Sequence, residues 1–172
     1  MAKVVWRNRK GGTLKGIAAL ALVALVAFSP AVHAASPGLL KVGISLGGTQ
    51  LVGLFLEYRV EQVSLALNFG SAVPWAFRDV SLAVQLRRYL APSSPTPYVG
   101  VGFWTFLVRE GDSWGWLTAM DFPVGLEWEL DAGRDLELGA IFHYFLSVRW
   151  KGNASLNFRT LVLPSLAYKW EW

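Results

Sequence analysis

The chain has 172 residues, no cysteine and a formal net charge of +4. The length suits one domain, and the lack of cysteine excludes disulfides and thiolate metal sites. Five of the 16 basic residues lie in the first 34 residues, which contain no acid, and the rest of the chain holds 11 basic residues against 12 acidic ones. The positive charge therefore belongs to the N-terminal segment, and the remainder lacks the basic patch that a nucleic-acid partner would require.

The first 34 residues have the three parts of a secretory signal peptide. A basic segment reaches Lys15, an apolar run covers residues 17–28, and Val32 and Ala34 occupy positions −3 and −1 of a cleavage site. The apolar run is about a dozen residues long and is ended by Pro30, whereas a membrane-spanning helix needs about 20 residues. We therefore predict a cleaved signal peptide at residues 1–34 and a mature domain at residues 35–172.

The mature domain repeats one pattern, in which apolar residues alternate with small or polar ones. This period of two is typical of β-strands with one apolar and one polar face. Eight strands are predicted, at residues 39–47, 51–60, 63–70, 80–89, 98–108, 120–130, 136–150 and 156–172. A two-residue hairpin at Glu61 and Gln62 should pair Val60 with Val63. We expect bulges at Pro123 and Pro164, since each removes a donor from its strand.

The connections between the strands follow from turn-forming residues. They are predicted as a short turn at residues 48–50, a longer loop at 71–79, a proline-punctuated link at 91–97, a polar loop at 109–114, a turn at 131–134 and a loop at 151–155.

The two faces of the predicted strands differ in size as well as polarity. One face carries Leu, Val, Phe, Tyr and Trp, and the other carries Gly, Ala and Ser with charges of both signs. A soluble barrel of the lipocalin type would turn the apolar face inward, but the interior of an eight-stranded barrel has little room. The small, polar face should thus be the interior. The prediction is an all-β fold, an eight-stranded antiparallel up-and-down transmembrane β-barrel.

Aromatic residues fall near the expected ends of this barrel, as in interfacial girdles. Trp128, Tyr168, Trp170 and Trp172 would mark one rim, and Phe69, Trp116 and Trp150 the other. The aromatics Trp75, Phe77, Trp114 and Trp150 could either anchor the second rim or grip a partner. Asn153-Ala154-Ser155 matches a glycosylation sequon, which we interpret as chance.

The last predicted strand ends on aromatic residues, with Tyr168, Trp170 and Trp172 on one face. It resembles the C-terminal strand of bacterial outer-membrane β-barrels, and the mature chain resembles the small OmpA/OmpX-type barrels, including the run PYVGVG at residues 97–102. The resemblance implies a monomer in the outer membrane of a Gram-negative envelope, with both termini periplasmic. It also implies delivery by periplasmic chaperones, recognition of Tyr168, Trp170 and Trp172 by the barrel-assembly machinery, and contact with outer-membrane lipids. The chain departs from full-length OmpA in having no peptidoglycan-binding domain after the barrel.

Eight inward-facing charges are predicted near the periplasmic end, four cations and four carboxylates: Lys41, Glu57, Arg59, Arg87, Glu127, Glu129, Glu137 and Lys169. Charges in so narrow a space need partners, because burying an unpaired ion costs several kcal/mol. They could form a neutral ion-pair plug or a gated ion path. The plug is favoured, because a selective pore would more typically carry one dominant sign.

A second polar group is predicted higher in the interior, comprising Gln85, Asp121, His143, Ser147, Arg149 and Arg159. Asp121, His143 and Ser147 could be written as a hydrolytic triad, but such an interior would give an acyl chain poor access. The outer-membrane lipid A deacylases carry a His-x-Ser-Asn motif, which the sequence around His143 lacks, and the rim histidine of palmitoyltransferase barrels is also missing. We therefore predict no enzymatic activity and no cofactor. The expected role is structural, in envelope integrity, or in surface interaction. The first alternative is a narrow channel for ions or small apolar solutes, and the third possibility, which trails both, is a lipid-modifying outer-membrane enzyme such as a lipid A-modifying hydrolase.

Overall fold

The computed structural model describes residues 38–74, 78–131, 133–149 and 159–172. The predicted signal peptide, the sequon at residues 153–155, and Trp75, Phe77 and Trp150 lie outside these residues. Among the residues described, no helix is long and apolar enough to cross a membrane.

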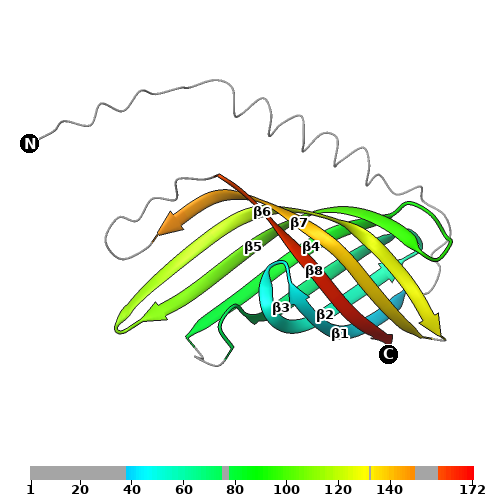
Figure 1. Cartoon of the computed structure of the whole chain (residues 1–172), viewed down its shortest axis with the longest axis horizontal. Coiled ribbons are helices and arrows are strands. Elements are labelled where there is room, and N and C mark those ends of the chain that lie inside the picture. The colour runs from blue at the N-terminus through cyan, green and yellow to red at the C-terminus, as the bar shows by residue number, and fades with distance from the viewer. Residues whose placement is uncertain (1–37, 75–77, 132, 150–158) are drawn as a thin grey trace, which may run out of the picture. The chain divides into compact units, whose positions relative to one another are not determined.

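Eight antiparallel strands close into a barrel, each paired with its neighbour in sequence and β1 paired with β8 (Figure 1). The fold class predicted from the alternation is confirmed. The strands are β1 (Leu39–Gly47), β2 (Gln50–Val60), β3 (Val63–Ser71), β4 (Asp79–Tyr89), β5 (Thr96–Glu110), β6 (Ser113–Asp131), β7 (Arg134–Arg149) and β8 (Thr160–Glu171).

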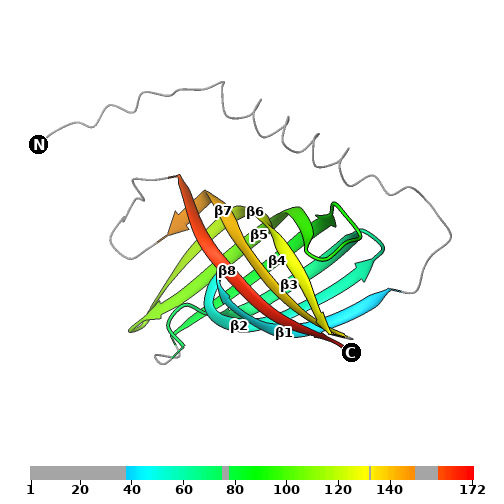
Figure 2. The same ribbon diagram turned by 45° about the vertical axis from the view of Figure 1, so that its right-hand side comes forward.

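The barrel wall is taller on one side than on the other. The β1–β2 hairpin is short, whereas the β5–β6 hairpin reaches well beyond it (Figures 1 and 2). The C-terminus lies at the end where β1 begins, since Lys41 pairs with Glu171 and the Trp172 amide donates to the Leu40 carbonyl over 3.0 Å.

Two hairpins show how local sequence sets the register. Val60 pairs with Val63 as predicted, and Glu61 takes a left-handed φ of 52° to make the tight turn. At the β1–β2 turn, Gly47 and Gly48 have φ of 74° and 67°, a region that glycine enters without steric cost.

The prediction of a polar loop at residues 109–114 is wrong. β5 and β6 continue through most of it, and Glu110 pairs with Ser113 across a two-residue turn in which Gly111 has φ of 59°. The sequence of this segment does not alternate clearly, and its strands are stabilised instead by the ladder that each forms with its neighbour. The turns at residues 48–50 and 131–134 are likewise tighter than predicted, because β2 begins at Gln50 and β7 at Arg134.

The bulges expected at Pro123 and Pro164 are also absent from the described ladders, where both prolines stay in register. The Pro164 carbonyl accepts a hydrogen bond from the Gly48 amide. The nitrogen and carbonyl of one residue point to the same side of an antiparallel strand, so the Pro164 nitrogen also faces β1, at the point where the β1–β8 pairing ends. A proline needs no bulge where its missing donor has no partner strand. At Pro123 the β5–β6 ladder merely lacks the rungs at Gly100 and Val101.

The orientation of the two faces is as the size argument predicted. The exterior exposes large apolar side chains such as Leu54 and Phe69, 65% and 54% accessible, whereas Ala66, Ala83 and Ala119 on the interior face are fully buried. Trp104 packs with Ala83 and Ala119, and Phe106, Leu117 and Phe145 lie against them. The interior of the taller part of the barrel is therefore a small apolar core.

Candidate functional site

The lower interior of the barrel is organised around one buried ammonium group. Lys169 Nζ on β8 lies 2.9 Å from a Glu57 carboxylate oxygen on β2 and 2.9 Å from Glu137 on β7, and it also pairs with Glu127 on β6. All four side chains are buried. An ammonium group has three donors, and each is used here by a carboxylate from a different strand.

Three further cations complete the arrangement. Lys41 Nζ lies 2.6 Å from Asp135 and 3.3 Å from Glu127. The Arg59 guanidinium donates to Glu127 over 2.9 Å, and the Arg87 guanidinium to Glu137 over 2.8 Å. We call this set the ionic cluster; it holds four cations and four carboxylates: Lys41, Glu57, Arg59, Arg87, Glu127, Asp135, Glu137 and Lys169.

Hydroxyl groups satisfy the remaining carboxylate oxygens. Tyr89 donates to Glu57 over 2.6 Å and lies 3.0 Å from Glu127, Tyr98 donates to Glu137 over 2.7 Å, and Ser64 donates to Glu57. With these three residues the network draws on all eight strands. Buried charges are tolerated when they are paired and fully hydrogen-bonded, which is the case here.

Glycines make room for the tyrosine of β5. A Cβ built on Gly125 or on Gly139 would lie 2.7 Å from the Tyr98 hydroxyl oxygen, closer than real Cβ contacts. The two glycines pair with each other across β6 and β7. They leave a gap in the lining into which the tyrosine reaches to meet Glu137.

The structure brings together seven of the eight residues predicted for this cluster. The exception is Glu129, which is exposed at the rim and forms no ion pair within the described residues. The fourth carboxylate of the ionic cluster is Asp135 instead, which pairs with Lys41. Asp135 has the same parity as Glu137, so the alternation of β7 contains the signal that places it inside.

The polar layer above the ionic cluster consists of Gln85, Asp121 and His143, all buried as predicted. His143 Nδ1 lies 2.7 Å from Asp121 Oδ1, and the imidazole packs against Trp104 with ring centroids 4.7 Å apart. Gln85 Oε1 accepts two bonds from Arg87, at 2.7 and 3.1 Å, and so connects the polar layer to the ionic cluster.

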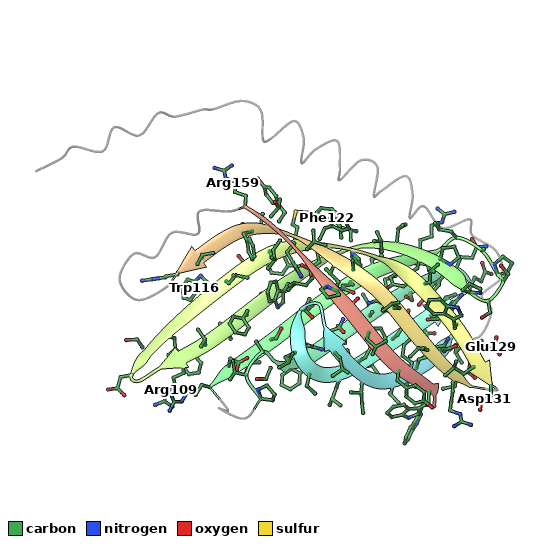
Figure 3. All side chains as sticks on the ribbon, viewed as in Figure 1. Arg109, Trp116, Phe122, Glu129, Asp131 and Arg159 are labelled. Atoms are coloured by element: carbon green, nitrogen blue, oxygen red, sulfur yellow. The ribbon has the colours of Figure 1, made fainter. Side chains whose placement is uncertain are left out.

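Three residues predicted for this upper group lie elsewhere. Ser147 and Arg149 are exposed, because the β6–β7 register shifts by one residue between Thr118 and Ala119 and reverses the facing of β7 beyond Phe145. The Arg149 guanidinium instead lies 5.0 Å from the centroid of the Trp116 ring on the outer face. Arg159 is exposed at the upper end of β8, outside the interior (Figure 3).

The hydrolytic triad is therefore not assembled. Asp121 and His143 form a pair, but the Ser147 hydroxyl belongs to the other face of the wall.

The three residues predicted as an assembly signal lie at the closing seam. Tyr168 and Trp170 pair with Ile44 and Val42 of β1, and their rings are 6.2 Å apart. The Trp172 side chain is exposed beyond the end of β8.

A closed barrel of eight strands with an apolar exterior and an ion-paired interior has the fold of the small outer-membrane β-barrels. The structure is similar to the crystal structure of Neisserial surface protein A, with a TM-score of 0.54 and 16% sequence identity over 81% of this chain and 100% of that one. No protein-family model matches the chain, and no curated protein does.

Proposed function

We propose that the chain is an integral protein of a bacterial outer membrane, with a structural or surface-interaction role and no catalytic activity. The apolar exterior supports the membrane location, because exposed Leu, Val and Phe residues cover the barrel wall. Closure supports it too, since a closed barrel leaves no strand edge unpaired in hydrocarbon. The fold shared with Neisserial surface protein A is consistent with this location.

The observation that carries the structural role is the ionic cluster. Its charges balance, and its members from opposite sides of the barrel bond to one another across the interior, as Arg87 of β4 does to Glu137 of β7. A path for ions needs mobile sites that an ion can enter and leave. Here each carboxylate is already held by a fixed cation, so the cluster acts as a plug that also ties the wall together.

One observation favours a narrow channel as the second candidate. Within the described residues, Asp121 Oδ2, His143 Nε2 and Gln85 Nε2 are buried and have no protein hydrogen-bond partner. Buried polar atoms of this kind are normally satisfied by water. A hydrated polar layer would leave the ionic cluster and the apolar packing around Trp104 as the barriers to small ions.

Single-channel recording in planar bilayers separates these candidates. We expect the wild-type barrel to show no steady open conductance, and Arg87→Ala/Lys169→Ala to show a cation-preferring one, because Glu57, Glu127 and Glu137 would remain. Arg88→Ala/Arg134→Ala removes the same charge from the other face of the wall and should stay silent. Steady wild-type conductance that collapses in Arg87→Ala or Glu127→Ala would refute the plug and establish the channel.

The predicted partners remain part of this proposal. The exposed Trp172 and the aromatic pair Tyr168 and Trp170 suit recognition by the barrel-assembly machinery, and periplasmic chaperones would hold the chain before insertion. We propose a monomer surrounded by outer-membrane lipids.

A further inference from the structure

Three arginines lie on the outer face at the end of the barrel opposite the C-terminus. Arg109 of β5 follows exposed Leu107 on the same face, and its amide donates over 2.7 Å to the carbonyl of Arg78, the residue that precedes β4. Arg149 of β7 lies over Trp116 of β6. Figure 3 shows Arg109 and Trp116 at one end of the barrel and Glu129 and Asp131 at the other.

The three positions form one continuous patch. Arg109 pairs with Trp114, and Trp116 pairs with Arg149. The patch therefore extends over four neighbouring strands, from the start of β4 to the end of β7. Asp79 is buried and Val80 exposed, so the alternation of β4 turns Arg78 to the same outer face. We call these five residues, Arg78, Arg109, Trp114, Trp116 and Arg149, the arginine–tryptophan rim.

The charge of this rim is not neutralised within the described part of the chain. None of its arginines forms an ion pair with a described carboxylate; the Arg109 Nε bonds instead to the Gly111 carbonyl over 3.1 Å. At the opposite end, the outward Arg134 is paired with Asp131. Among the described residues, the arginines of this rim therefore lack the carboxylate partner that Arg134 has at the other end.

The rim adjoins the apolar exterior. Directly below it on the same face are exposed Val80, Leu82, Phe103 and Leu107. Tryptophan favours the boundary between hydrocarbon and headgroups, and arginine side chains extend their guanidinium groups into the same layer. A planar guanidinium binds phosphate through two parallel hydrogen bonds. A patch at this height therefore meets the phosphates of lipids before it meets any soluble partner.

We infer that the arginine–tryptophan rim binds phosphate-bearing lipid headgroups in the leaflet at this end of the barrel. The inference rests on the proposed membrane location, and it adds a lipid preference that the location alone does not require. It also accounts for the difference between the two rims. Unpaired arginines would be useful only at the end of the barrel that lies in the leaflet richer in exposed phosphate.

The test uses the wild-type mature chain refolded into phosphatidylcholine vesicles. Electron paramagnetic resonance of spin-labelled lipids measures the fraction held at the barrel surface, and phosphatidic acid is compared with phosphatidylcholine as the probe. We expect the wild type to prefer phosphatidic acid. In Arg109→Gln/Arg149→Gln the preference should fall by about fivefold for each arginine removed, since one basic residue near an anionic surface contributes about that factor.

The matched control is Arg88→Gln/Arg134→Gln, which removes the same charge from the opposite rim and should keep the preference. Equal loss in both variants, or no loss in either, would overturn the inference. Abolition of the preference by an equal concentration of inorganic phosphate would overturn the assignment to a lipid surface. Circular dichroism and vesicle flotation report insertion separately, so a barrel that inserts without lipid preference refutes the rim alone, whereas failure to insert refutes the proposed membrane location.

Discussion

Lys169 is the residue on which the interior depends most directly. Its ammonium group is fully buried and pairs with Glu57, Glu127 and Glu137. Tyrosine hydroxyls donate further hydrogen bonds to two of these carboxylates, Glu57 and Glu137. A buried ion pair contributes little by itself, because desolvation offsets the attraction. Loss of one partner is different, since the remaining charges stay buried without compensation.

We therefore expect Lys169→Ala to destabilise the barrel by about 3–5 kcal/mol, the cost of an uncompensated buried charge. Urea unfolding of the vesicle-embedded protein, followed by tryptophan fluorescence, measures this change. The control is Arg134→Ala, which breaks the exposed pair with Asp131 and should leave the free energy of unfolding nearly unchanged, because water screens that pair. Equal effects of the two substitutions would show that the ionic cluster does not stabilise the fold.

At the scale of the strand, one irregularity decides which residues meet lipid. The register shift between β6 and β7 inserts one residue near Leu146, and the side-chain period of two then reverses. Up to Phe145 the odd-numbered residues of β7 face inward. Beyond it Ser147 and Arg149 face outward, and this reversal is what moves Arg149 onto Trp116.

This reversal predicts the surroundings of position 147. The chain has no native cysteine, so Ser147→Cys can be labelled alone with an environment-sensitive fluorophore. In vesicles containing doxyl-labelled lipids, we expect quenching at position 147 comparable to that at outward-facing Leu107→Cys. The inward control is Ala83→Cys, which should be protected. Protection at 147 equal to that at 83 would mean that the strand alternates without a shift.

For the whole molecule, the distribution of apolar surface determines the solvent in which the barrel is stable. Apolar side chains that a soluble protein would bury lie outside, whereas the interior holds charges. The strands nonetheless close completely, so the backbone is satisfied without water on the outer face. The fold is thus suited to a bilayer.

Residues 35–172 should accordingly aggregate in plain buffer and become monodisperse in detergent micelles, as measured by size-exclusion chromatography with light scattering. The physical reason is the contiguous apolar exterior, which is far larger than a soluble monomer normally exposes. A monodisperse, folded monomer in buffer without detergent would contradict the membrane location and the function that depends on it.

Much of the interior was predictable because alternation reports facing directly. Lys41, Glu57, Arg87 and Lys169 were placed inside by parity alone, and the hairpin between Val60 and Val63 followed from its two-residue turn. Parity breaks down where one residue is inserted, and no local signal marks Leu146 as the site of that insertion. The same limit applies at residues 109–114, where strand formation depends on neighbours rather than on the segment itself.

The sequence by itself determined the number of strands, the face that they turn inward except beyond Phe145 in β7, and the balance of charge within, because side-chain period and size are local properties. Only the tertiary structure decided which cation meets which carboxylate, that Asp135 rather than Glu129 binds Lys41, and that Arg149 lies outside beside Trp116. These pairings join residues from strands far apart in the chain. Their geometry is set by the register and closure of the whole barrel, and no single segment contains it.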